Sequence, residues 1–247
     1  MSYQAFDTAP KDTHAAGLDA LHLASQERTA SEAVAGVDPG KILRAILPET
    51  IPLAKAAQDA DPALVHANFI ALFAMTPSQM PATLRYSLHL SPFGQLLIAS
   101  GPEGVCHVTF AKTHHGALQE LSEAFPRARL LQLDDSRHER VLAVFNGARD
   151  RTQKIDLHIP GTAFQHRVWN ALLSIPQGTL VTYGQIAEFI GQPQAARAVG
   201  TAIGANRAAF LVPCHRVVRR SGEIGGFMWG VERKTAMIAR EIGEDRA

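Results

Sequence analysis

The sequence predicts an α+β fold in three parts, which differ in the spacing of their apolar residues. Residues 1–83 are rich in alanine and show no strand pattern. Residues 84–159 mix strand-like and helix-like segments, and residues 160–247 hold four helix-like segments. With 247 residues, 46% of them hydrophobic and 19% charged, the chain has an ordinary globular composition. We expect a small helical N-terminal extension followed by two domains.

In the first part, two short helices are predicted over residues 50–60 and 62–74. They lie on either side of Asp61–Pro62, and the segment "MTPSQM" ends the second. Proline opens a helix readily but interrupts one that precedes it, so this pair predicts a break at that point.

In the second part, the loosely alternating segments "LRYSLHLS" and "QLLIASG" flank the turn residues Pro92–Phe93–Gly94 and predict a β-hairpin. "GVCHVTFAK" continues it as a third strand that contains Cys106. Two helices follow at about 115–125 and 136–146, the second ending at Asn146–Gly147. "KIDLHIPG" predicts a last strand.

In the third part, "TAFQHRVWNALLSIP" has apolar residues at helical spacing, with Thr162 as a candidate N-cap. "TYGQIAEFIG" predicts a second short helix and "QPQAARAVGTAIGAN" a third. The glycine-rich "RRSGEIGGFMWG" predicts a hairpin, and a final helix runs from about Val231 to Ile242. Two short helices with a tight turn and then a hairpin indicate a winged helix-turn-helix.

The predicted third helix carries almost no large side chains, since its surface positions are mostly Ala and Gly. Glycine costs about 1 kcal/mol relative to alanine in a helix, so Gly200 and Gly204 need a reason. One reason is close packing against a neighbouring helix. The other is close approach to a narrow groove, with Arg197 as the one long cation. The residues alone leave both open.

The net charge of +1 conceals an asymmetry along the chain. Residues 160–247 carry 10 Lys+Arg against 6 Asp+Glu, a net charge of +4, and residues 1–159 carry 14 against 17, a net charge of −3. A basic C-terminal third is mildly indicative of a phosphate-bearing partner.

The sequence also bears on location. No apolar run reaches transmembrane length, and the N-terminus lacks the basic and apolar regions of a secretory signal. Cys106 and Cys214, the only cysteines, do not make a disulfide framework. We expect a cytoplasmic protein without a membrane partner.

Cys214 stands in "VPCHRVV", next to His215. A thiol reacts as its thiolate, which neighbouring basic groups favour. Adjacent residues of an extended segment point in opposite directions, so the imidazole would reach the sulfur only through a turn or a water. A carboxylate should orient the imidazole, and Glu241 on the last helix is a candidate.

Three simpler interpretations of Cys214 compete with this one. Most Cys-His dipeptides have no function, and Cys106–His107 in this chain is a natural comparison that we expect to be buried core. Zinc is disfavoured because no second cysteine lies at finger spacing, and a hydrolase because neither a G-x-S-x-G elbow nor a cysteine-protease signature is present. We expect no metal and no cofactor.

"PCHRVV" resembles the active-site signature of the O6-alkylguanine-DNA alkyltransferases, in their Ada-like branch. "GTAFQHRVWNALLSIPQGTLVTYGQIAEFIGQPQAARAVGTAIGAN" resembles the family's helix-turn-helix, and "GVERKTAMIAREIG" its closing helix. The resemblance covers residues 160–247 as a winged helix-turn-helix catalytic domain. It extends more weakly over 84–159 as a ribonuclease-H-like domain.

The resemblance implies a role for each matching residue. Cys214 is the alkyl acceptor, His215 takes its proton through a water, and Glu241 holds that histidine. Asn206 ties the recognition helix to the active-site turn, and Tyr183 rotates a phosphate and donates to guanine N3. Arg197 fills the gap in the base stack, on a DNA-contacting helix that also presents Ala196 and Gly200. The pocket residues are Val217, Phe227, Met228 and Trp229.

The implied reaction is the repair of O6-methylguanine, and of O4-methylthymine, by one irreversible transfer to Cys214. The implied partner is double-stranded DNA, bound by a monomer through the minor groove, which is about 6 Å wide and admits small side chains. The target base is flipped out of the stack, because its reacting atom cannot be reached there.

The pocket departs from the family pattern. A tyrosine followed by small residues is usual where this chain has Phe227, Met228 and Trp229. The preference among alkyl groups is therefore open.

Residues 50–85 weakly resemble the second helix-turn-helix of AraC-type regulators, which raises the alternative of a methylation-sensing transcription regulator. No cysteine for an Ada-type zinc domain precedes Cys106, and the predicted reading helix 62–74 has no Lys or Arg. Helices that read DNA normally carry such contacts. We interpret residues 1–83 as a degenerate remnant of such a regulator module. An unrelated helical extension would explain these residues nearly as well. A third hypothesis is a DNA-binding module with an inert Cys214.

Overall fold

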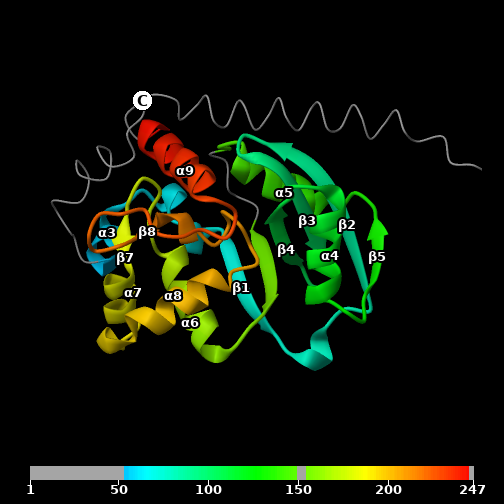
Figure 1. Ribbon diagram of the computed structural model, residues 1–247, viewed down its shortest axis with the longest axis horizontal. Helices are drawn as coiled ribbons and strands as arrows, with labels where there is room; N and C mark the ends of the chain where they lie inside the picture. The colour runs from blue at the N-terminus through cyan, green and yellow to red at the C-terminus, as the bar shows by residue number, and fades with distance from the viewer. Residues whose placement is uncertain (1–52, 149–153, 245–247) are drawn as a thin grey trace, which may run out of the picture.

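The computed structural model describes residues 53–148 and 154–244, which form a mixed α/β structure (Figure 1). The helices of this part are α3 Leu53–Asp59, α4 His114–Ala124, α5 Ser136–Phe145, α6 Ala163–Leu173, α7 Tyr183–Phe189, α8 Ala196–Gly204 and α9 Val231–Glu244. The strands are β1 Ile70–Met75, β2 Thr83–Ser91, β3 Gly94–Ser100, β4 Val105–Phe110, β5 Arg129–Gln132, β6 Ile155–Pro160, β7 Val181–Thr182 and β8 Val217–Val218. None of these helices is long and apolar enough to span a bilayer.

Six strands form one sheet in the order β1-β6-β4-β3-β2-β5. The strands β2, β3 and β4 are antiparallel neighbours, whereas β1, β6 and β5 join the sheet in parallel pairs. All six residues of β4 are buried, because elements cover both of its faces. Figure 1 shows α4 and α5 beside this sheet, with α6, α7 and α8 gathered at the opposite end of the molecule and α9 above them.

The structure confirms most of the predicted elements. The hairpin forms as β2 and β3, and the third strand as β4. The helices expected at about 115–125, 136–146, 162–176 and 231–242 form as α4, α5, α6 and α9. Thr162 caps α6 as expected: its hydroxyl accepts from the Gln165 amide at 3.2 Å, and the Gln165 side chain accepts from the Thr162 amide at 2.7 Å.

The helix predicted over residues 62–74 is wrong. Two single 3-10 turns, η1 Pro62–Leu64 and η2 His66–Asn68, are followed by strand β1, which pairs in parallel with β6. A short apolar run such as "IALFAM" cannot be assigned to a helix or a strand by periodicity alone. Here it forms a strand because it pairs with β6 at the edge of the sheet. The predicted reading helix of the weak AraC-type resemblance over residues 50–85 therefore does not form.

The hairpin predicted in the glycine-rich segment is also wrong. Residues 219–230 contain no strand, although the Arg219 amide donates to the Glu223 carbonyl at 2.9 Å and closes a tight turn. The preceding Val217–Val218 instead pairs in parallel with Val181–Thr182. Gly222, Gly225 and Gly230 have positive φ, which favours loop over strand. The edge strand β5 was not predicted.

The small residues of α8 serve two purposes. Ala202 is buried, and its carbonyl accepts the Trp169 indole N–H at 2.9 Å, which ties α8 to α6. A Cβ added to Gly200 would lie 3.7 Å from the Tyr183 ring, in ordinary contact, and one added to Gly204 would meet nothing within 4 Å. Close helix packing therefore accounts for Ala202 but not for the two glycines.

Two buried histidines, His107 on β4 and His138 on α5, predict how stability depends on pH. His107 is fully buried, and neither ring nitrogen makes a hydrogen bond to the described residues, although Nε2 lies 3.6 Å from Glu120 Oε1. Burial lowers its pKa to about 3, and burial lowers that of His138 to about 4. Between pH 6.5 and these values the unfolded chain binds protons that the folded chain excludes, so stability falls as the pH falls.

We predict that His107→Leu keeps the unfolding free energy within about 1 kcal/mol of the wild type at pH 7, because no hydrogen bond is lost. At pH 4 the variant should lose less stability than the wild type. Urea unfolding at both pH values measures this, and identical pH dependence in the two proteins would exclude His107 as a source of acid sensitivity.

Candidate active site

Cys214 lies in the 3-10 turn η5 Cys214–Arg216, between the loop that follows α8 and strand β8. The thiol is buried, with 4% of the residue exposed. The turn begins where the Cys214 amide donates to the Val212 carbonyl at 2.7 Å. The resulting bend places Cys214 and His215 on one compact turn, instead of on opposite faces of an extended strand.

Asn206, directly after α8, fixes this turn through its side-chain amide. Its oxygen accepts from the Ala208 amide at 2.9 Å, and its nitrogen donates to the Val212 carbonyl at 3.0 Å and to Cys214 Sγ at 3.2 Å. The Asn206 side chain thus joins the segment after α8 to the turn that carries Cys214, and its role in the reaction stays a prediction.

His215 is fully buried and bound on one side only. Its Nε2 lies 2.9 Å from Glu241 Oε1, while its Nδ1 has no hydrogen-bond partner among the described residues. An ionised carboxylate only accepts hydrogen bonds, so the proton of the neutral ring is on Nε2 and the lone pair is on Nδ1. Burial lowers the pKa of His215, against the opposing charge of Glu241.

Phe210 supports the imidazole from one face. Its ring stacks on His215 with centroids 5.0 Å apart and planes 6° apart. Phe210 has φ of 65°, a left-handed conformation that no other described non-glycine residue adopts. Such a conformation costs about 1–3 kcal/mol in a bulky residue and persists only where the surroundings impose it.

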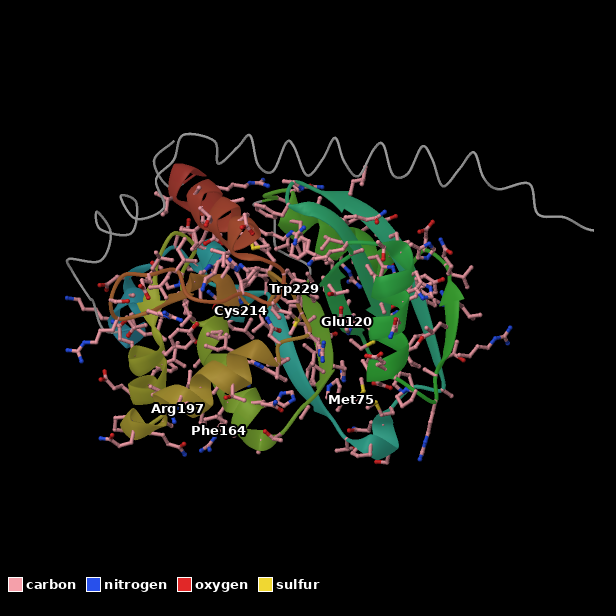
Figure 2. The ribbon with its side chains drawn as sticks, viewed as in Figure 1. Met75, Glu120, Phe164, Arg197, Cys214 and Trp229 are labelled. Atoms are coloured by element: carbon pink, nitrogen blue, oxygen red, sulfur yellow. The ribbon has the colours of Figure 1, made fainter. Side chains whose placement is uncertain are left out.

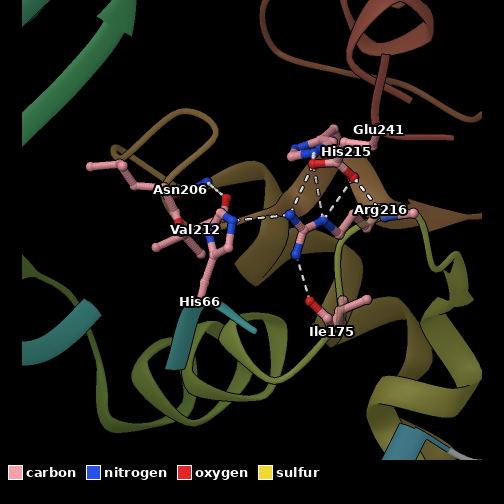
Figure 3. Close-up of polar contacts among 9 residues, drawn as sticks. His66, Ile175, Asn206, Val212, His215, Arg216 and Glu241 are labelled. Carbon is pink, nitrogen blue, oxygen red and sulfur yellow. Dashed lines mark hydrogen bonds and ion pairs between the residues drawn. The ribbon is translucent and has the colours of Figure 1, made fainter. Parts of the chain in front are cut away.

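Glu241 is the centre of a buried network, which Figure 3 shows. Besides His215, it accepts from Arg216 Nε at 3.0 Å and Arg216 Nη2 at 2.9 Å, and from the Gly178 amide at 3.3 Å. Burial alone would raise the pKa of Glu241, but the charge of Arg216 and the contact with His215 outweigh it and hold the pKa far below its usual range. The carboxylate is therefore ionised at neutral pH.

Arg216 and His66 were not singled out from the sequence. Both are fully buried; Arg216 Nη1 donates to the Ile175 carbonyl at 2.5 Å, and Arg216 Nη2 lies 3.0 Å from His66 Nε2. The position of Arg216 within "PCHRVV" could have drawn attention to it. No local signal marks His66, which is 150 residues away in the chain.

Opposing influences act on the thiol. Burial raises the pKa of Cys214, whereas the Asn206 hydrogen bond and the charge of Lys234 lower it. Lys234 is buried and donates to the carbonyls of Val217 and Ile224, both at 2.6 Å. Burial lowers its own pKa to about 8, with Cys214 opposing this. At rest the sulfur is a thiol that needs a base.

Cys214 opens into a cavity of about 390 Å³. It is lined by Tyr183, Gly200, Ile203, Gly204, Asn206, Cys214, Gly226, Phe227, Met228 and Trp229. The two glycines of α8 form part of this wall, which accounts for the absence of side chains there. Burial raises the pKa of Tyr183, and a neighbouring Cys214 thiolate would raise it further, so the phenol keeps its proton at neutral pH.

The three residues that depart from the family pattern all line the cavity, yet only Met228 is exposed. Trp229 is 6% exposed, and its indole N–H donates to Thr109 Oγ1 at 2.8 Å on strand β4. The Phe227 and Trp229 rings pack edge to face with centroids 5.2 Å apart. The sheet thus holds one wall of the cavity.

Besides His215 and Glu241, three candidate residues lie outside the cavity lining. Arg197 is exposed at the start of α8, next to the partly buried Ala196, and Figure 2 shows it well away from Cys214. Val217 is buried in β8, with its carbonyl bonded to Lys234. Their roles stay predictions. The His, Cys, Asp and Glu side chains of the described residues form no group of three suited to a metal ion.

We predict that Glu241→Gln destabilises the protein by about 3–5 kcal/mol, because Arg216 would remain buried without its counter-charge. Glu223→Gln is the matched control: Glu223 also pairs with an arginine, Arg219, at 2.7 Å, but on the exposed surface. It should cause no measurable change. Urea unfolding compares the two, and equal small effects would show that the Glu241 network does not stabilise the fold.

Comparison with known proteins agrees with this geometry. Residues 163–242 match the family model of the 6-O-methylguanine DNA methyltransferase, DNA binding domain. The regulatory protein Ada of Salmonella typhimurium is 43% identical over 166 residues, which are 66% of this chain and 47% of that protein. The chain thus spans about half the length of this relative.

Shorter relatives are matched over nearly their whole length. The methylated-DNA–protein-cysteine methyltransferase of Haemophilus influenzae is 36% identical, with 64% of this chain and 86% of that protein aligned. The crystal structure of the Mycobacterium tuberculosis O6-methylguanine methyltransferase superimposes with a TM-score of 0.54 at 34% identity, covering 65% of this chain and 94% of the other. The chain therefore belongs to the family of methylated-DNA–protein-cysteine methyltransferases.

Proposed function

We propose that this protein repairs DNA by transferring the alkyl group from O6 of guanine to Sγ of Cys214. The observation that carries the proposal is a thiol at a cavity wall, followed in the same turn by a buried imidazole that a buried carboxylate orients. Cys214 lines the cavity, and His215 is bonded to Glu241 at 2.9 Å. This is the arrangement that activates a cysteine nucleophile.

The proton of Cys214 passes through a water molecule to Nδ1 of His215. Since Nε2 donates to Glu241, Nδ1 is the basic nitrogen of the ring. The imidazolium formed is stabilised by the ionised Glu241, and the thiolate by the Asn206 amide at 3.2 Å and by the charge of Lys234. Proton transfer costs little because the donors are already in place.

In the transfer step the sulfur attacks the alkyl carbon as the bond from that carbon to guanine O6 breaks. The electron pair moves into the base, which takes a proton at N3 from the Tyr183 hydroxyl. His215 then releases its extra proton to solvent, and Tyr183 takes one up from solvent, so that both side chains return to their starting protonation states. The product thioether is stable, so each molecule reacts once. Transfer from O4-methylthymine would follow the same steps.

We propose that double-stranded DNA is bound by a monomer through its minor groove, with α8 as the inserted helix. The exposed start of α8 carries Arg197, and Ala196 and Gly200 leave the helix surface low. In this proposal the sheet part is the ribonuclease-H-like domain and the C-terminal part a winged helix-turn-helix without a stranded wing. The free thiols of Cys106 and Cys214 fit a cytoplasmic location.

A transcription regulator of the Ada type is the alternative, and the described structure gives it no additional support. Residues 62–75, which would hold the reading helix, form two 3-10 turns and strand β1 instead. We therefore propose repair rather than promoter recognition as the activity of this chain.

We predict that Cys214→Ser abolishes methyl transfer from duplex DNA containing O6-methylguanine but retains DNA binding, because a hydroxyl is too weak a nucleophile here. Cys106→Ser should transfer at the wild-type rate per folded molecule, since Cys106 is buried in the sheet and burial raises its pKa far above the usual range.

Intact mass after mixing with the DNA measures the transfer. One added methyl group is expected on the wild type and on Cys106→Ser, and none on Cys214→Ser. Wild-type protein that binds the DNA but gains no mass would be a binding module with an inert cysteine, and transfer retained in Cys214→Ser would overturn the assignment.

We predict that Arg197→Ala slows the repair of O6-methylguanine in duplex DNA about tenfold or more, because a side chain that fills the vacated stack offsets part of the cost of flipping. Its reaction with the free base O6-methylguanine should be unchanged. Arg127→Ala removes an equally exposed cation from the far domain and controls for overall charge. Equal losses on both substrates would mean that Arg197 supports the fold or the thiol and does not support base extrusion.

A further inference from the structure

His66 connects the N-terminal segment to the buried charges behind Cys214. It lies in η2, which precedes β1, and so comes before the residues that match the family model, 163–242. The side chain is fully buried, with Nδ1 2.8 Å from the Leu211 carbonyl and Nε2 3.0 Å from Arg216 Nη2. Figure 3 shows it beside the Arg216 guanidinium, with Glu241 and His215 above that group and Ile175 below it.

The contacts of His66 with Leu211 and Arg216 determine where its proton lies. A carbonyl oxygen can only accept, so Nδ1 carries the hydrogen and donates to Leu211. A guanidinium can only donate, so Nε2 offers its lone pair to Arg216. His66 is therefore a neutral hydrogen-bond acceptor, and it adds no charge beside the ion pair of Arg216 and Glu241.

The contact matters because Arg216 Nη2 is shared. One of its hydrogens bonds Glu241 Oε1 at 2.9 Å, and His66 accepts the other. Without that acceptor a fully buried donor would be left unsatisfied, a condition that proteins relieve by moving the group. If the guanidinium rotates, the hydrogen bonds that its Nε and Nη2 donate to the Glu241 carboxylate change. Oε1 of that carboxylate also bonds His215.

We infer that His66 is a positioning residue for the Cys214 site: through Arg216 it fixes the carboxylate of Glu241 against His215. The N-terminal segment is then part of the reactive unit. Two further contacts support this, since the Gln177 amide donates to the Leu64 carbonyl at 2.9 Å and Val65 bridges Pro176. These contacts hold the turn that supplies the Ile175 carbonyl to Arg216 and the Gly178 amide to Glu241.

The predicted consequence is a change in how readily Cys214 loses its proton. If Glu241 turns away, His215 loses the negative charge that favours its protonation and becomes a weaker base. The thiolate then forms only at higher pH. The other charged or titratable groups near the thiol and imidazole are Tyr183 on α7, Lys234 on α9, and Arg219 after β8.

Two amide substitutions separate the two nitrogens of His66. His66→Gln places an oxygen where Nε2 lies and keeps an acceptor for Arg216, whereas His66→Asn places its amide where Nδ1 lies and loses that acceptor. His166→Asn is the control, because it removes another buried imidazole, bonded to the Ile159 carbonyl at 3.0 Å and not to Arg216.

The measurement is the pH midpoint for alkylation of Cys214 by iodoacetamide in the full chain, which requires neither DNA nor a methylated base. Its rationale rests on the proposed function, but its outcome does not depend on repair: loss of transfer with normal thiol titration would count against the function alone. We expect His66→Asn to raise the midpoint by about one pH unit, a fall of about tenfold in rate below it. His66→Gln and His166→Asn should keep the wild-type midpoint.

Equal midpoints in all four proteins, or equal shifts in both His66 variants, would overturn the inference. Thermal unfolding shows whether each variant is folded. Should His66→Asn not fold, ¹⁵N NMR of the wild-type imidazoles decides instead. An unprotonated Nε2 on His66 supports the contact with Arg216, and a protonated Nε2 excludes it.

Discussion

The ion pair between Arg216 and Glu241 is the interaction on which the rest of the C-terminal structure depends. Both groups are almost wholly buried, and removing two charges from water is costly unless their remaining hydrogen-bonding capacity is satisfied. Here Gly178 and His215 complete the shell of the carboxylate, and Ile175 and His66 complete that of the guanidinium. Four separate segments of the chain must therefore meet at one point. An arrangement with so many obligatory partners has little freedom to shift, which suits a site that must hold an imidazole in one orientation.

The same constraint links stability to reactivity. The Glu241 carboxylate that neutralises the charge of Arg216 also accepts from Nε2 of His215. Nδ1 is therefore the basic atom of the ring, and no other residue is needed to set this tautomer. Phe210 supports the imidazole at the cost of a left-handed backbone, and Asn206 secures the turn that carries Cys214. In the proposed mechanism the thiol stays protonated in its buried, low-dielectric site until His215 acts as its base. In this proposal burial protects Cys214 from unspecific reactions, and the pre-formed proton acceptor, Nδ1 of His215, activates it.

Most of the elements could be predicted from the sequence, because helices such as α6 carry both an apolar stripe and a capping residue, Thr162. Cys214, His215, Asn206 and Glu241 could be named because their motif resembles a known family. The errors have physical causes: "IALFAM" is apolar in either conformation, and only pairing with β6 makes it a strand. No local pattern marks His66, and although Arg216 stands in "PCHRVV", its contact with His66 could not be predicted from that motif. Their roles arise from a contact between residues 150 positions apart, which only the tertiary structure brings together.

The central claim is that the buried carboxylate fixes the proton of His215 on Nε2 and leaves Nδ1 as the base for Cys214. The most direct measurement is ¹⁵N NMR of the protein labelled at histidine, in the absence of DNA and at neutral pH, with His215 assigned by substitution. The account predicts one neutral ring with its proton on Nε2, hydrogen-bonded to Glu241, and an unprotonated Nδ1. A proton on Nδ1 of His215 in the resting protein would contradict the account, because no base would then face the thiol.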